Sequence, residues 1–222
     1  MQVKNTKDVV AVIPFYNEKP FIKEIINQTL PFVQYIIAVD DGSTDGSSEQ
    51  ILGIERVMIL KHNSNLGKGA ALRTGYKKSA EMGAQYIVAL DADLQHAPQN
   101  IPLFVFELEK YPVVIGYRKR EFGVMPIQRI ASNFITSAIL SVKIGVSIKD
   151  SQSGFRGFRS DIIDLIMPTR NGFEAETEQI ILAAKNNLAI GWVPIPTVYG
   201  EEKSSIKPIE AIKGFIKTVI EL

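Results

Sequence analysis

Two carboxylates separated by one residue, Asp91 and Asp93, follow the short apolar segment Tyr86–Leu90. Because such a run fits a buried strand, both side chains would leave a sheet at one edge and reach a single hard cation. Gln95 adds an amide oxygen two positions later, and His96 is an alternative ligand for a softer metal. The triplet predicts a Mg²⁺ or Mn²⁺ site, and the structural alternative is a polar turn after the strand.

A second pair of carboxylates, Asp40 and Asp41, follows the β-branched run Tyr35–Val39. Carboxylates at a strand end can accept hydrogen bonds from a base or a ribose, and the glycines that follow let the backbone approach a ligand closely. The alternative is an Asx-type turn in which Thr44 or Asp45 caps a following helix. The residues alone leave these two interpretations open.

A third polar segment follows the run Val9–Ile13 and contains Pro14, Tyr16 and Glu18. Tyr16 can stack on a base, and Glu18 can accept hydrogen bonds from a base or sugar, so this segment is a candidate nucleotide contact. A proline turn leading into a helix is the alternative.

Lys68 stands between two glycines at the predicted start of a helix. A helix N-terminus attracts anions, and the ammonium of Lys68 adds to that attraction, so a phosphate contact is expected. The Walker pattern of Gly-x-x-x-x-Gly-Lys-Ser/Thr is absent, which argues against a P-loop.

These motifs share one position, because each follows the carboxyl end of an expected strand. Apolar runs alternate with amphipathic segments through the first half, which indicates an α/β fold with a mainly parallel, doubly wound sheet. Ligands of such sheets bind beyond the carboxyl ends of the strands. The expected strands are 9–13, 35–39, 57–60, 86–90, 113–117 and, at an edge because of its prolines, 192–198; the expected helices are 19–30, 68–82, 126–142 and 174–186.

The chain has 222 residues, no cysteine and a formal net charge of +1. Disulfides and thiolate metal sites are therefore excluded, and the charge balance argues against a general nucleic-acid binder. No segment has the length of a signal peptide core or a transmembrane helix, so we expect a cytoplasmic protein. The amphipathic end of the chain, which carries Lys213 and Lys217 beside an apolar face, allows peripheral contact with a membrane.

In their order, five motifs resemble those of the family 2 glycosyltransferases and, more narrowly, of the polyprenyl-phosphate sugar synthases. They are Val-Ile-Pro-Phe-Tyr-Asn-Glu (12–18), Val-Asp-Asp-Gly-Ser-Thr-Asp (39–45), Asn-Leu-Gly-Lys-Gly-Ala-Ala (65–71), Asp-Ala-Asp-Leu-Gln-His (91–96) and Ser-Gly-Phe-Arg-Gly-Phe (153–158). The resemblance covers roughly residues 8 to 205. It implies a GT-A fold, a Mg²⁺ or Mn²⁺ ion and a nucleoside-diphosphate sugar donor, with GDP-mannose favoured and UDP-glucose possible.

The resemblance also assigns roles to individual residues. It implies that Tyr16, Glu18 and Asp41 line the nucleotide pocket with Asp40 beside them, and that Asp91, Asp93 and Gln95 hold the metal. The implied acceptor is a polyprenyl phosphate, whose oxygen is already anionic. Such an acceptor needs cations more than a general base.

Arginine presents a fork suited to phosphate oxygens, and the resemblance implies that Arg118 and Arg129 bind the acceptor phosphate. A solvated basic loop and a helix-surface salt bridge are the respective alternatives. Arg156 is a third candidate, although Phe155 and Phe158 beside it also fit a core anchor. Glu176 can orient a sugar hydroxyl or the acceptor, or can simply begin a helix.

Lys203 lies in a segment that resembles the family's mobile loop over the donor, where it would neutralise a phosphate. We therefore expect a catalytic domain at 1–205 and an amphipathic helix at 206–222. The predicted activity is inverting transfer of a hexose, mannose favoured, to polyprenyl phosphate at a membrane surface. The rivals are transfer to a glycan hydroxyl, with Glu176 as the first candidate base, and a nucleotidyltransferase or sugar-nucleotide binding module.

Overall fold

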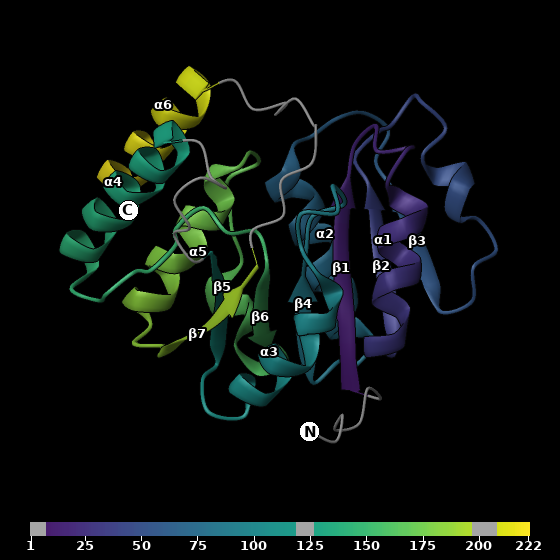
Figure 1. Cartoon of the computed structure of the whole chain (residues 1–222), viewed down its shortest axis with the longest axis horizontal. Helices are drawn as coiled ribbons and strands as arrows, with labels where there is room; N and C mark the ends of the chain where they lie inside the picture. Colours follow the sequence, from purple (N-terminus) through teal and green to yellow (C-terminus); the bar gives the residue numbers. More distant parts are fainter. Residues whose placement is uncertain (1–7, 119–126, 197–207) are drawn as a thin grey trace.

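The computed structural model describes residues 8–118, 127–196 and 208–222, with main chain only at 127–132 and 208–213. Within them a seven-stranded sheet in the order β3-β2-β1-β4-β6-β5-β7 has helices on both faces (Figure 1). The strands are β1 (Val9–Phe15), β2 (Tyr35–Asp40), β3 (Val57–Lys61), β4 (Tyr86–Ala89), β5 (Val113–Arg118), β6 (Arg156–Arg159) and β7 (Ile190–Ile195). The α-helices are α1 (Ile22–Thr29), α2 (Lys68–Glu81), α3 (Ile101–Leu108), α4 (Ile127–Ile144), α5 (Glu174–Lys185) and α6 (Pro208–Glu221).

The predicted mainly parallel sheet is confirmed. β1 pairs in parallel with β2 and β4, β2 with β3, and β5 with β7. β7 lies at the edge of the sheet, as predicted. Pro194 has no N–H to donate, and an edge strand tolerates this because no further strand pairs on its outer side. The strand β6, which was not predicted, runs antiparallel between β4 and β5. Its four residues, Arg-Gly-Phe-Arg, lack the apolar run that marks the other strands.

Apolar residues fill both faces of the sheet, and β1 shows the division most clearly because all seven of its residues are buried. Val9, Ala11, Ile13 and Phe15 point to the side covered by α1 and α3. Val10 and Val12 point to the side covered by α2 and α5. The alternation follows from the two-residue period of a strand, and burial on both faces explains why the run carries no polar residue.

The prediction of a helix after Thr44 or Asp45 is wrong. A single 3-10 turn, Ser48–Ile51, stands there instead. Asp45 accepts hydrogen bonds from the amide and hydroxyl of Ser47, so it closes a tight turn and does not begin an α-helix.

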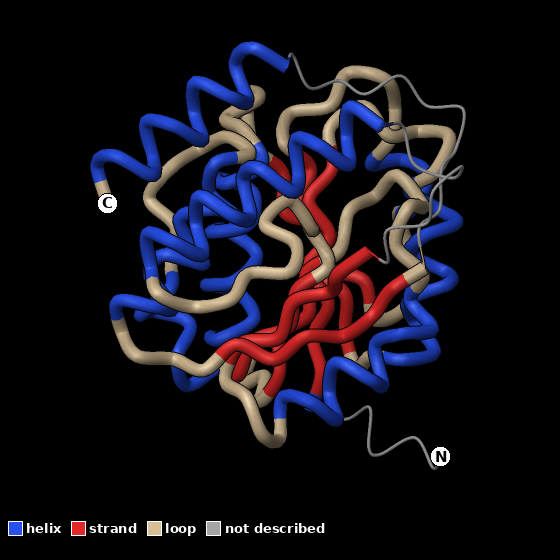
Figure 2. Tube along the Cα trace, turned by 60° about the vertical axis from the view of Figure 1, so that its left-hand side comes forward, coloured by secondary structure: helices blue, strands red, loops and turns tan. Residues whose placement is uncertain are grey.

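The helices α4 and α6 lie side by side outside α5, at the end of the molecule farthest from β3 (Figures 1 and 2). Phe215, Val219 and Leu222 of the C-terminal segment pack on the same core as α2 and α5. Arg170 adds an ion pair of 2.6 Å to Glu221. None of the described helices has the length and apolar character that crossing a bilayer requires.

Candidate active site

The loops that follow β1 and β2 are joined by hydrogen bonds at the carboxyl edge of the sheet. The amide of Asn17 donates to Ser43 Oγ at 2.9 Å, and the amide of Thr44 donates back to Asn17 Oδ1 at 2.9 Å. Asn17 has a φ of 57°, a value that asparagine tolerates better than most residues. The two predicted nucleotide segments therefore form one layer of loop.

Of the candidate nucleotide contacts in the first segment, Tyr16 is exposed and available to a ligand. Glu18 is half-buried, and its carbonyl accepts the amides of Phe21 and Ile22 where α1 begins. Pro14 is buried inside β1, opposite Val39 in the register with β2. Tyr16 and Glu18 thus remain contact candidates, while Pro14 supports the loop from within the sheet.

Asp40 has an internal role in this structure. Its carboxylate is fully buried and accepts hydrogen bonds from the amide of Ser43 at 2.7 Å and from the hydroxyl of Ser48, and Lys61 Nζ lies 3.3 Å away. Burial alone would raise the pKa of Asp40, but the hydrogen bonds from Ser43 and Ser48 outweigh it and hold the pKa below its usual range. The Asx-type turn is therefore the better description of this residue.

Asp41 is likewise engaged by its own chain. Its carboxylate accepts the amides of Leu66 at 3.0 Å and Gly67 at 2.7 Å and lies 2.7 Å from His62 Nδ1. These contacts fasten the end of β2 to the loop before α2, so Asp41 sets the position of Lys68. The predicted hydrogen bond from a base to Asp41 would have to share oxygens that are already in use.

The centre of the candidate site is a cluster of Lys68, Asp91 and Glu176. Lys68 Nζ lies 2.5 Å from Asp91 Oδ1 and 2.9 Å from Glu176 Oε1. The three residues come from the start of α2, the end of β4 and the first turn of α5. The predicted residues Asp91, Lys68 and Glu176 are thus brought together, with the ammonium between the two carboxylates.

The charges in this cluster stabilise one another. Burial would lower the pKa of Lys68, but Asp91 and Glu176 raise it above its usual range. Burial would raise the pKa of Asp91, but the ammonium of Lys68 holds it below its usual range. Both groups are therefore ionised at neutral pH.

The first amides of α2 are occupied by another loop. The carbonyl of Asn171 accepts the amide of Gly69 at 2.6 Å and that of Ala70 at 3.4 Å. Arg73 holds the same loop by donating to the carbonyls of Pro168, Thr169 and Arg170. The side chain of Lys68, more than the helix N-terminus, is therefore the part of this motif that can meet a phosphate.

The residues 91–95 fit a divalent ion that shares its coordination with phosphate oxygens. Across the described part of the chain, no three His, Asp or Glu side chains gather to enclose a metal. Asp91, Asp93 and Gln95 offer two carboxylates and an amide, and such an incomplete oxygen set suits Mg²⁺ or Mn²⁺ held together with a diphosphate. Leu94 has a φ of 62°, and the amide of Gln95 donates to Asp93 Oδ1 at 3.0 Å, so a tight turn arranges these residues.

Gly154 of the Ser-Gly-Phe-Arg-Gly-Phe motif lies against the carboxylate of Asp91. A Cβ added to Gly154 would overlap Asp91 Oδ2, so only glycine leaves room for that carboxylate. His96 also contacts this segment, and its Nδ1 accepts the amide of Asp91 at 3.1 Å. Burial lowers the pKa of His96, which favours the neutral ring, and the Nδ1 that accepts the amide of Asp91 is not available to a metal.

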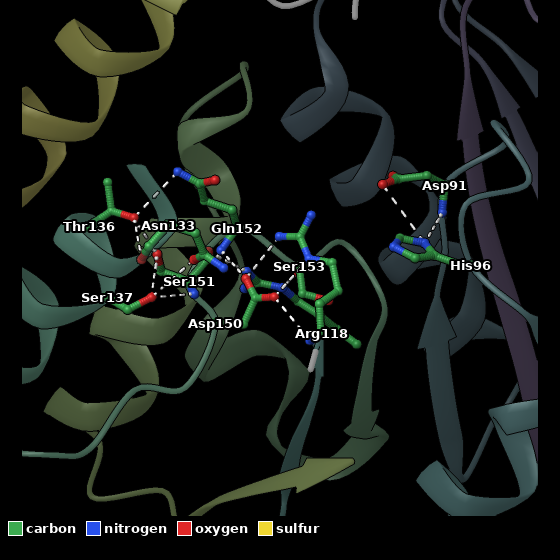
Figure 3. Close-up of polar contacts among 11 residues, drawn as sticks. Asp91, His96, Arg118, Asn133, Thr136, Ser137, Asp150, Ser151, Gln152 and Ser153 are labelled. Atoms are coloured by element: carbon green, nitrogen blue, oxygen red, sulfur yellow. Dashed lines mark hydrogen bonds and ion pairs between the residues drawn. The ribbon is translucent and has the colours of Figure 1, made fainter. Parts of the chain in front are cut away.

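Arg118 forms a forked ion pair with Asp150, a residue that was not among the predicted site residues. Its Nε and Nη2 donate to Asp150 Oδ2 at 2.9 Å and Oδ1 at 3.0 Å, and its amide donates to Asp150 Oδ2 at 3.3 Å (Figure 3). Asp150 is fully buried, so it fixes the plane of the guanidinium at the end of β5. Arg118 is not the solvated basic loop residue of the alternative interpretation.

A network of hydroxyls and amides supports Asp150 from the side of α4 (Figure 3). Ser137 Oγ donates to Asn133 Oδ1 at 3.1 Å and accepts the amide of Ser151 at 3.0 Å. Thr136 Oγ1 lies 2.9 Å from Ser151 Oγ. These contacts bind the loop 150–153 to the inward face of α4.

Arg156 is not a phosphate ligand in this structure. Its side chain is fully buried and donates to the carbonyls of Ser153 at 2.8 Å, Glu176 at 2.5 Å and Ser151 at 3.2 Å. The predicted core anchor is confirmed, since Phe155 and Phe158 beside it are also buried. Arg156 thus ties the loop 150–154 to the first turn of α5.

This loop joins the two halves of the site. Asp150 holds Arg118 at one end and Gly154 lies against Asp91 at the other, so the two contacting residues are four positions apart along the chain. Four residues span at most about 14 Å. Arg129 lies in the first turn of α4 with only its main chain described, and Lys203 lies outside the described residues.

The sheet, with its carboxylate cluster beyond the end of β4, defines a GT-A type glycosyltransferase architecture. Residues 10–167 match the family described as Glycosyl transferase family 2. The chain belongs to this family, so the resemblance stated from the motifs is confirmed.

The names of two curated relatives include a phosphorylated polyprenol, as dolichyl phosphate or as polyprenol monophosphomannose. A UDP-N-acetylglucosamine–dolichyl-phosphate N-acetylglucosaminyltransferase of Methanococcus voltae is 35% identical over 220 residues, which covers 88% of this chain and 87% of the relative. A polyprenol monophosphomannose synthase of Mycolicibacterium smegmatis is 27% identical over 208 residues, which covers 87% and 78%.

Solved structures agree in fold. Glucosyl-3-phosphoglycerate synthase from Mycobacterium tuberculosis, in complex with Mn²⁺, UDP and glucosyl-3-phosphoglycerate, superimposes with a TM-score of 0.72 at 20% identity. The match covers 96% of this chain and 77% of that one. The predicted GT-A fold is thereby confirmed.

Proposed function

We propose that this chain transfers a sugar from a nucleoside-diphosphate sugar to a polyprenyl phosphate. The observation that carries the proposal is the loop 150–154, which sets the carboxylate Asp91 and the guanidinium of Arg118 at its two ends. Acceptor and donor both carry phosphate charge and so need cations; we assign the metal proposed at Asp91 to the donor and Arg118 to the acceptor. The names of the relatives support the same reaction.

On the donor side, Asp91, Asp93 and Gln95 would hold Mg²⁺ or Mn²⁺, which supplies positive charge to the leaving diphosphate. Lys68, which is held by Asp91 and Glu176, would add a second positive charge to the binding of that diphosphate. Tyr16 and Glu18 lie in the loop where the base and ribose would bind. We assign Lys68 and Glu176 to positioning the donor, and Glu176 no role as a base.

On the acceptor side, the phosphate oxygen needs no deprotonation near neutral pH, so no general base is required. Arg118, whose orientation Asp150 fixes, is the first proposed contact of that phosphate, and Arg129 is the second. One phosphate oxygen attacks the anomeric carbon as the bond to the donor diphosphate breaks. The electron pair of that bond leaves with the nucleoside diphosphate, and a single displacement inverts the anomeric configuration.

For the donor we propose UDP-N-acetylglucosamine first, because the relative at 35% identity carries that donor in its name. GDP-mannose is the second candidate. It is favoured by the motif resemblance and by the relative named as a phosphomannose synthase. The lipid acceptor sets the reaction at a membrane surface.

The test uses the purified chain with Mn²⁺, each of UDP-N-acetylglucosamine, UDP-glucose and GDP-mannose, and a polyprenyl phosphate. We expect one donor to give a lipid-linked sugar of inverted configuration, and we expect Asp91→Ala to abolish the transfer. The control is Leu52→Ala, a change at an exposed residue that makes none of the site contacts described above. Transfer to a free glycan hydroxyl but to no lipid phosphate would overturn the proposal in favour of the glycan alternative.

A further inference from the structure

Phe173 is a large apolar side chain that the fold leaves exposed beside the candidate site. It stands immediately before α5, whose first turn carries Glu176, and 42% of it is exposed. It belongs to neither of the two apolar clusters that the described residues form. A single exposed ring is ordinary on a protein surface, so the argument rests on what surrounds this one.

The ring of Phe173 lies next to the central charged cluster of the site. Lys68 Nζ stands 5.6 Å from the ring centroid, which is within the range over which an ammonium is attracted to an aromatic ring. The same Nζ lies 2.5 Å from Asp91 Oδ1 and 2.9 Å from Glu176 Oε1. Phe173 is therefore an apolar neighbour of the three charged side chains at the centre of the site.

The main chain around Phe173 is held in place on both sides. The carbonyl of Asn171 accepts the amide of Gly69 at 2.6 Å, and a Cβ added to Gly67 would overlap that carbonyl. The carbonyl of Phe173 accepts the amide of Glu176 at 3.3 Å as α5 begins. The ring is thus presented from a fixed main chain, which lowers the entropy cost of binding a ligand against it.

Phe173 is connected to the donor part of the site. It reaches the cluster through Lys68, whereas Arg118 is connected to Asp91 through the loop that ends at Gly154. The proposed function assigns Lys68 to the donor and Arg118 to the acceptor. The ring therefore falls to the donor.

The donor has one portion that suits an apolar ring. Its diphosphate is charged and is assigned to the metal and to Lys68, and the candidate contacts of its base and ribose, Tyr16 and Glu18, lie in the loop after β1. The remaining portion is the hexose. A hexopyranose exposes C–H groups on a face of its ring, and an aromatic side chain offers a flat apolar surface to such a face.

We propose that Phe173 contacts the sugar of the nucleotide-sugar donor and makes the site prefer that donor to the bare nucleoside diphosphate. The identity of the ligand rests on the proposed function. Once the sugar has moved to the acceptor, the nucleoside diphosphate no longer makes this contact, which favours its exchange for a new donor.

The test is isothermal titration calorimetry of the full chain with Mn²⁺ and two matched pairs of ligands. The pairs are UDP-N-acetylglucosamine with UDP, and GDP-mannose with GDP. For the pair that binds the wild type, we expect Phe173→Ala to bind the nucleotide sugar about tenfold more weakly and the nucleoside diphosphate equally well. Binding of the nucleoside diphosphate also shows that the site of the variant is folded.

Phe106→Ala is the matched control. Phe106 lies on α3, is also 42% exposed, and has its own ammonium neighbour, Lys110 Nζ, 4.1 Å from the ring centroid. This control should leave both affinities at their wild-type values. Phe173→Tyr keeps the aromatic ring and should keep the preference for the nucleotide sugar.

Three results would overturn the inference. Equal weakening of both ligands by Phe173→Ala would show that the ring acts only through Lys68, and unchanged affinity for both would show that it touches no part of the donor. A wild type that binds no nucleotide sugar would remove the ligand altogether. Transfer to polyprenyl phosphate is measured separately: if no lipid phosphate accepts a sugar while Phe173→Ala weakens the nucleotide sugar alone, the proposed function fails and the sugar contact stands.

Discussion

Removal of the Lys68 ammonium should tighten metal binding in the absence of donor. Lys68 Nζ lies 2.5 Å from Asp91, the first proposed metal ligand, and so competes with a cation there. At an effective dielectric constant of about 20, unit charges at this distance attract with roughly 6 to 7 kcal/mol before any desolvation cost. Desolvation cancels most of that energy, so the net competition is much smaller.

Lys68→Met alone would leave Glu176 buried without its cation, which costs about 3 to 5 kcal/mol of stability. The variant to test is therefore Lys68→Met with Glu176→Gln, which keeps the net charge of the protein. We expect Mn²⁺ affinity to rise about tenfold to a hundredfold, or roughly 1.4 to 2.8 kcal/mol. The same variant should bind nucleoside diphosphate more weakly at saturating Mn²⁺, because a positive charge near the diphosphate is lost.

The assay is a titration of the free Mn²⁺ signal by electron paramagnetic resonance. Lys68→Arg keeps the charge and should behave like the wild type, and Asp91→Asn should lose binding. Equal or weaker Mn²⁺ affinity in the folded double variant would show that Lys68 does not compete for Asp91, and the reasoning would fail.

Three further predictions follow from single contacts. Asp150→Asn should free the plane of Arg118 and lower kcat/KM for the lipid phosphate by about 10 to 100-fold with the donor KM unchanged, as steady-state kinetics would show. Gly154→Ala should push the loop from Asp91 and raise the donor KM at least about tenfold, with thermal unfolding reporting whether the fold survives. Asp40→Asn should cost about 1 to 3 kcal/mol in urea unfolding at pH 7. Because the folded pKa of Asp40 is depressed, its stabilisation is complete above about pH 4 and lost as the pH falls through the folded pKa, so the difference between Asp40→Asn and wild type should shrink at pH 3.

The sequence predicted the elements that local pattern determines. Apolar runs ending in Asp40 and Asp91 located β2 and β4, and the helical spacing after Lys68 located α2. These signals are local because a buried strand must be apolar over its own length. The strand β6 had no such signal, and only its partners β4 and β5 make it a strand.

Partner choice between distant residues was not predictable in the same way. Asp150 and Arg118 are 32 residues apart, and no pattern in either segment announces their pairing. Asp41 looked like a ligand for a base, but it binds Leu66 and Gly67, which the fold brings to it. A carboxylate at a strand end has the same appearance in sequence whether its donors come from a ligand or from the next loop.

Arg156 shows why a charge inside the protein can serve a site that it does not touch. A carboxylate in its place would add negative charge near Asp91, the proposed metal ligand, and would oppose the ionisation of Asp91. Burial raises the pKa of Asp91. The charge of Lys68 counters this effect most strongly, and the charge of Arg156 also lowers the pKa of Asp91. The carbonyls of Ser151, Ser153 and Glu176 accept hydrogen bonds from the buried guanidinium of Arg156. These bonds offset its desolvation without an acidic partner. The guanidinium therefore fixes the loop 150–154 and favours the charged form of Asp91 with the same set of contacts.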